Sequence, residues 1–69
     1  MNENYKRALM AEHVKEEILY MLRSMGEKAD LDNCESLEEY AEWLEEMTPN
    51  ELYDTHSIVY RSFSTQKEE

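Results

Sequence analysis

The chain has 69 residues, one cysteine and a formal net charge of −10, and 41% of its residues are hydrophobic. That length allows one domain with a small core, and Cys34 alone cannot form a disulfide within the chain. The negative charge disfavours direct nucleic-acid binding, which needs clustered Lys and Arg. A lone thiol, and no apolar run longer than residues 18–22, favour a cytoplasmic protein without a signal peptide or a membrane span.

The first predicted helix covers residues 4–25 and is followed by Gly26, a residue type that commonly closes helices. At 100° per residue, one arc of this segment is apolar and consists of Met10, Ala11, Val14, Ile18, Met21, Leu22 and Met25. A second apolar group lies off that arc and consists of Tyr5, Leu9, Leu19 and Tyr20. Two apolar sides indicate a central helix or a surface for another chain, so we include a homodimer through this second group among the expectations.

Residues 27–35 show no period and are predicted to form a loop. The second predicted helix, residues 37–47, begins at a capping box in which Ser36 accepts from the Glu39 amide and Glu39 reaches back to the Ser36 amide. Its apolar side, with Trp43 at the margin, consists of Leu37, Tyr40, Ala41, Leu44 and Met47. The opposite arc consists of Glu38, Glu39, Glu42, Glu45 and Glu46.

The third predicted helix, residues 49–63, starts with Thr48 as the cap, Pro49 at the first helical position and Glu51 three residues after the cap. His56 lies on its apolar face and is expected to be a histidine at the edge of the core, hydrogen-bonded to a backbone or tyrosine group. Residues 64–69 are expected to fray. The predicted fold is all-α: a single small domain, residues 1–69, that forms a three-helix bundle.

Residues that usually catalyse reactions or bind metals are sparse. We therefore expect that the protein is not an enzyme and that it has no cofactor and no metal site. Cys34 lies in an acidic stretch, which disfavours the reactive thiolate, and a single glycine excludes the usual phosphate-binding loop. Residues 30–34 begin like a calcium loop but lack the third ligand, the turn glycine and the closing glutamate. His13 and Glu17 could share a zinc ion, yet no second pair is spaced to complete the site.

The acids are segregated in one stretch, residues 30–54, which we call the acidic block. It holds ten carboxylates and no Lys or Arg, namely Asp30, Asp32, Glu35, Glu38, Glu39, Glu42, Glu45, Glu46, Glu51 and Asp54. Residues 1–26 and 55–69 each carry as many bases as acids, so the net charge arises in the middle of the chain. A block in which so many charges of the same sign are concentrated is suited to binding a basic partner.

A short acidic chain of this kind resembles the DNA-mimic inhibitors that phages make to disable host DNA-binding proteins. The ten acids of the acidic block carry the resemblance, because such mimics share charge rather than a motif or a fold. The resemblance implies an inhibitor that acts in the host cytoplasm by occupying the DNA-binding surface of a basic protein. Known targets of the class include HU-type nucleoid proteins, restriction enzymes, uracil-DNA glycosylase and CRISPR effectors. The small size of this chain favours a small nucleoid protein.

The expected partner-binding residues are Asp30, Asp32, Glu35, Glu38, Glu42, Glu45, Glu46 and Asp54. The alternative is a generic helical adaptor or regulatory subunit, for instance an antitoxin-like partner. It would make its functional contact through the apolar patch of the first helix, with Tyr5, Leu9 and Tyr20, joined by Ile58 of the third helix, while the acids only solvate their face. A mimic needs carboxylates that are contiguous across the second helix and its flanking loops, whereas an adaptor needs only the apolar patch.

Overall fold

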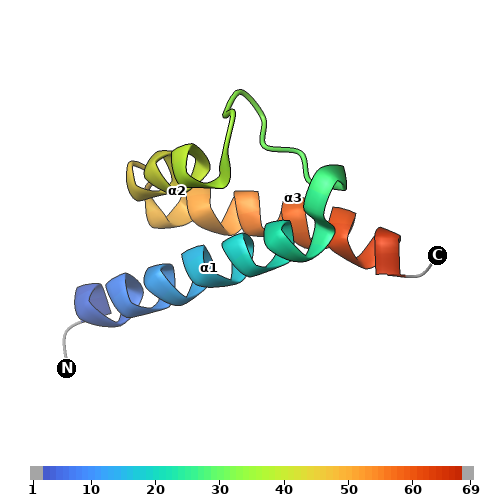
Figure 1. Ribbon diagram of the computed structural model, residues 1–69. Coiled ribbons are helices and arrows are strands. Elements are labelled where there is room, and N and C mark those ends of the chain that lie inside the picture. Colours follow the sequence, from blue (N-terminus) through green and yellow to red (C-terminus); the bar gives the residue numbers. More distant parts are fainter. Residues whose placement is uncertain (1–2, 68–69) are drawn as a thin grey trace.

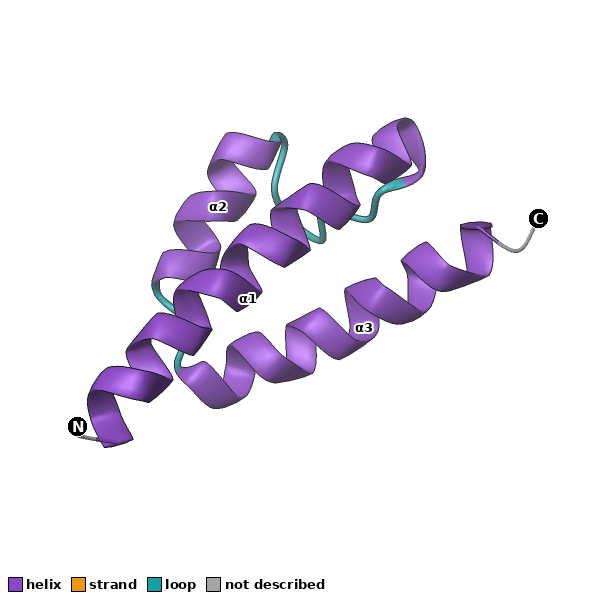
Figure 2. Ribbon diagram, turned by 90° about the horizontal axis from the view of Figure 1, so that it is seen from below, coloured by secondary structure: helices purple, strands orange, loops and turns teal. Residues whose placement is uncertain are grey.

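The protein is a three-helix bundle, as predicted. The computed structural model describes the backbone of residues 3–67 and the side chains of residues 9–66. Over that range the chain forms no strand, and its helices are α1 (Glu3–Met25), the short 3-10 helix η1 (Gly26–Lys28), α2 (Leu37–Glu45) and α3 (Pro49–Lys67). The two long helices, α1 and α3, run in the same general direction (Figure 1; Figure 2). The shorter α2 lies between them in the sequence and runs in the opposite direction. The bundle is flat, with extents of 42 × 26 × 15 Å.

Side-chain caps explain where α2 and α3 begin. The Ser36 hydroxyl accepts from the Glu39 amide at 3.2 Å, but the Glu39 carboxylate accepts from the Glu35 amide at 3.1 Å rather than from Ser36. The predicted reach-back bond therefore falls one residue earlier, where it still satisfies an amide outside the helix. At α3 the box is reciprocal: Thr48 Oγ1 accepts from the Glu51 amide at 3.3 Å, and Glu51 Oε1 accepts from the Thr48 amide at 3.2 Å.

Two of the helix ends differ from the prediction. Gly26 closes α1 as expected, with φ +60° in the left-handed region that favours glycine. The second helix ends at Glu45 rather than at residue 47, because Pro49 disfavours helical backbone at the residue before it and the chain must already be turning. The tail was predicted to fray from residue 64, but α3 continues to Lys67, since no Gly or Pro stops it. Residues 68–69 of that prediction lie outside the described part of the chain.

The core lies where α1 meets the other two helices. Its buried residues are Ala11, Ile18, Met21 and Leu22 from α1, Tyr40 and Leu44 from α2, and Leu52 and Val59 from α3. α1 packs against α3 and against α2, whereas α2 makes few direct contacts with α3. Met10 was predicted to share the core arc but is exposed, because the first turns of α1 extend past the ends of the other helices (Figure 1).

One ion pair and one histidine–carboxylate hydrogen bond join α1 to its neighbours at the edge of the core. Lys15 Nζ lies 2.8 Å from Glu12 on its own helix and 3.2 Å from Glu45 on α2. His56 Nε2 on α3 lies 2.8 Å from the Glu17 carboxylate, and its ring stacks on Tyr60 at 6.2 Å. His56 is half-buried at the core edge as predicted, but its partner is a carboxylate rather than a backbone or tyrosine group.

Candidate protein-binding face

All the carboxylates that were predicted to contact a partner are exposed. Most of them lie on the outer side of α2 and on the loop before it, a surface that we call the acidic face. Its members are Asp30, Asp32, Glu35, Glu38, Glu39, Glu42, Glu45 and Glu46. Asp54 lies on α3, so it belongs to a different helix from the rest. The acidic face therefore gathers seven of the eight predicted residues and adds Glu39, which the prediction left out.

One predicted contact residue, Glu45, already has a cationic partner. The Lys15 side chain is only 12% exposed and bridges Glu12 and Glu45. The hydrogen bond to Glu12, joined by the one to Glu45, raises the pKa of Lys15 although partial burial acts in the opposite direction. Lys15 thus stays charged and balances one carboxylate at this margin of the acidic face. Nothing in the sequence pattern indicates this contact of Glu45, since Lys15 and Glu45 lie far apart in the chain.

Local hydrogen bonds shape the loop that carries the remaining acids. Asp32 has φ +60°, a left-handed conformation that Asp tolerates better than most residues. Its amide donates to Asp30 Oδ1 at 2.9 Å, and the Cys34 amide donates to the Leu31 carbonyl at 2.9 Å. These bonds fold the loop on itself with short polar side chains, and the fold leaves the carboxylates of Asp30 and Asp32 exposed.

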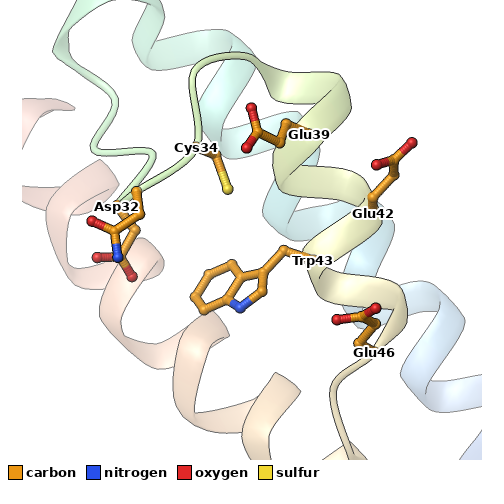
Figure 3. A pocket seen from close by; sticks show the side chains of 7 residues that line it. Asp32, Cys34, Glu39, Glu42, Trp43 and Glu46 are labelled. Atoms are coloured by element: carbon orange, nitrogen blue, oxygen red, sulfur yellow. The ribbon is translucent and has the colours of Figure 1, made fainter.

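The indole of Trp43 lies at the edge of the acidic face, between α2 and the loop before it. It projects from α2 towards the loop that carries Asp32, with Glu42 and Glu46 extending from the same helix (Figure 3). Trp43 is 37% exposed, and its ring makes an edge contact with the Tyr40 ring, at 5.2 Å between centroids and 72° between planes. A pocket of about 350 Å³ is lined here by Asp32, Asn33, Cys34, Glu39, Glu42, Trp43 and Glu46. We call it the acidic pocket.

The acidic pocket adds an aromatic surface that the predicted contact set missed. The sequence placed Trp43 at the margin of the apolar side of its helix, next to Glu42. That position was the available signal, because an aromatic residue at such a border touches both the core and the solvent. The roles of Asn33 and Cys34 had no comparable signal, since they depend on how the loop folds back beside α2.

The Cys34 thiol and the Tyr40 phenol, at or near the acidic pocket, favour their neutral forms. Partial desolvation raises the pKa of Cys34, and the negative charges of Glu39 and Asp32 add to the effect. Burial raises the pKa of Tyr40 to about 12, with smaller contributions from Asp32, Cys34 and Asp30. A protonated thiol is a poor nucleophile, so this environment disfavours covalent chemistry at Cys34 and favours the binding of positive charge.

The second apolar group of α1 divides into different environments. Leu9 is 46% exposed and Tyr20 is 66% exposed, whereas Leu19 is half-buried and packs against the core. The side chain of Tyr5 lies outside the described residues. The predicted self-association surface therefore retains Leu9 and Tyr20 as its described, exposed members, and the homodimer stays a prediction.

No protein-family model, curated protein or solved structure matches this chain. Among the described residues, no group of three or more His, Cys, Asp or Glu side chains is arranged to hold a metal ion. The helices of residues 3–67 also include none that is both long enough and apolar enough to cross a membrane.

Proposed function

We propose that this protein binds a basic DNA-binding protein through its acidic face and blocks the access of DNA to that protein. A small nucleoid protein of the HU type is the favoured partner class. The observation that carries the proposal is the exposure of the whole predicted carboxylate set, most of it on α2 and the adjacent loop. A basic groove that accepts DNA would meet a row of negative charges here, spaced more widely than those of DNA.

The density of charge on α2 supports this proposal. Five carboxylates lie between Glu38 and Glu46. At a rise of 1.5 Å per residue they span about 12 Å, or roughly one charge per 3 Å. Duplex DNA carries one charge per ~1.7 Å of its axis when both strands are counted. Lys15 balances Glu45 and Glu39 accepts a capping bond, so the three acids with the freest charge are Glu38, Glu42 and Glu46.

The proposal is tested by DNA displacement. A fluorescent duplex is bound to a purified HU-type protein, and unlabelled protein is added while anisotropy is recorded. We expect displacement that weakens as salt rises, because charge complementarity acts mainly on the encounter and is screened by ions. The triple variant Glu38→Gln, Glu42→Gln and Glu46→Gln should compete at least about tenfold less well.

Glu45→Gln is the matched control, because it removes the same kind of charge from the same helix. Its carboxylate is already paired with Lys15, so it should lower competition by about twofold or less. Equal competition by the wild type and the triple variant would contradict the proposal. Direct binding of the duplex by this protein would also contradict it, since the expected contact is with the protein.

A helical adaptor remains the second candidate because large apolar side chains of α1 are exposed, Leu9 and Tyr20 among them. Leu9 and Tyr20 lie on the face of α1 opposite Ile18, which is fully buried. The acids would then only solvate their side of the bundle. If Leu9→Ala and Tyr20→Ala abolish partner binding while the triple glutamine variant binds at full strength, the adaptor is correct and the mimic is wrong.

A further inference from the structure

A groove opens between α2 and α3, on the side of the bundle where those helices make few direct contacts. Its volume is about 330 Å³. The buried side chains of Leu22, Tyr40 and Val59 contribute to its lining, so it reaches the apolar core. It exists because α1 packs against both helices while α2 does not close onto α3. We call it the α2–α3 groove.

The edges of the α2–α3 groove combine an apolar side with an acidic side. Ile58 and Ser62 of α3 line it, and Ile58 is 68% exposed. Asp30 and Asp32 of the loop line it as well. An exposed isoleucine next to a lining of core residues offers apolar area that a partner could remove from water.

Trp43 and Asp32 line both the α2–α3 groove and the acidic pocket, so the two spaces adjoin at the indole. Indole faces attract cations, Arg most often, and the neighbouring Glu42 and Glu46 carboxylates can accept hydrogen bonds from a guanidinium. Among the described residues that line the two spaces, none is Lys or Arg. The positive charge that this surface lacks would therefore come from the partner.

We propose that the α2–α3 groove and the acidic pocket form one docking site for a basic protein segment in which an apolar residue is adjacent to an arginine. The apolar side chain enters the groove beside Ile58, and the guanidinium stacks on Trp43 between the carboxylates of Glu42 and Glu46. This site deepens the proposed function, because it names the segment of the basic partner that the acidic face receives. It adds an apolar contact that pure charge mimicry lacks and that salt does not screen.

Charge complementarity favours a basic segment over DNA or a second copy of this chain as the occupant of this site. DNA carries the same sign as the acidic face and would be repelled. A second copy of this chain also carries a net charge of −10, so its approach to this side is opposed. A basic segment gains both from the carboxylates and from the apolar lining, which makes it the complementary occupant.

The chain contains a single tryptophan, so its fluorescence reports directly on the site. The probe is the peptide acetyl-Ser-Arg-Leu-Arg-Ser-amide, titrated into the full-length protein. We expect a saturable change in Trp43 emission with a Kd below about 1 mM. Replacing both arginines of the peptide by uncharged citrulline, or its leucine by serine, should weaken binding at least about tenfold. Equal binding of all three peptides, or no saturable change, overturns the proposal.

Two matched serine variants test the location of the docking site. Ser62→Tyr places a large side chain on a residue that lines the α2–α3 groove, whereas Ser57→Tyr makes the same change at an exposed position of α3 outside it. Ser62→Tyr should weaken peptide binding at least about tenfold, and Ser57→Tyr by less than about twofold. Circular dichroism should show the same helicity in both variants. Equal effects of the two variants overturn the site.

The failure of this site and the failure of the proposed function give different results. If the wild type displaces DNA from the nucleoid protein and Ser62→Tyr displaces it equally well, the docking site is wrong and the acidic mimic stands. If the wild type displaces no DNA but binds the peptide in a way that Ser62→Tyr abolishes, the site stands and the proposed function is wrong. Self-association that Ser62→Tyr abolishes would assign the groove to a second copy and overturn the proposal.

Discussion

Truncation of Leu44 tests the packing that holds α2 in place. Leu44 is fully buried, and Tyr40 and Leu44 are the two buried residues of α2. Leu44→Ala removes three carbon atoms, a transfer cost of about 2.4 kcal/mol at ~0.8 kcal/mol each, and the cavity left behind raises the loss to roughly 3–4 kcal/mol. A chain of this size has a total stability of about 3–10 kcal/mol. The substitution should therefore remove a large fraction of the folding free energy.

The assay is urea denaturation followed by circular dichroism and by Trp43 fluorescence. Ile58→Ala is the matched control, because it truncates a similar aliphatic side chain that is largely exposed and should cost less than about 0.5 kcal/mol. A Leu44→Ala variant that is already unfolded without urea agrees with the reasoning. A loss below about 1 kcal/mol, or equal losses for the two variants, would refute the burial of this face of α2.

Three further results are expected. Burial raises the pKa of Tyr40 from 10.0 to about 12, so the stability that its neutral phenol confers is complete below pH 10 and is lost as the pH rises through 12. The alkaline loss in the denaturation midpoint should be smaller in Tyr40→Phe than in the wild type, and an equal loss in both would rule Tyr40 out as a source of it. The raised pKa of Cys34 should make its alkylation near pH 8 slower than that of a free cysteine peptide. Asp32→Asn should speed this alkylation, and an unchanged rate would contradict a contribution of the Asp32 charge to the raised pKa of Cys34. If α1 forms a homodimer, sedimentation at high micromolar concentration should show a dimer that Tyr20→Ala weakens, and a monomer throughout would contradict it.

The helices were predictable because their signals are local. The caps at Ser36 and Thr48 and the left-handed glycine at Gly26 depend on residues within one turn, so the sequence alone indicates them. The wrong prediction for Met10 has a tertiary cause. Met10 fits the apolar arc of its helix, but α2 and α3 do not extend far enough to cover it.

The candidate site was also predictable only in its local features. The exposure of the acids on α2 followed from helical periodicity, which separates Glu42 from Leu44. The pairing of Glu45 with Lys15 could not follow from it, because the two residues meet only after α2 has packed on α1. The α2–α3 groove could not be predicted from the sequence either, because it depends on how far apart α2 and α3 lie in the folded chain.

Nuclear magnetic resonance of the complex with an HU-type nucleoid protein tests the central claim most directly. Amide shifts of the isotope-labelled chain are recorded as the unlabelled basic protein is added. The largest changes should fall on residues 30–46, with the Trp43 indole among them, and should shrink as salt rises. Changes centred instead on Leu9 and Tyr20, or a spectrum that does not respond, would contradict a function carried by the acidic face.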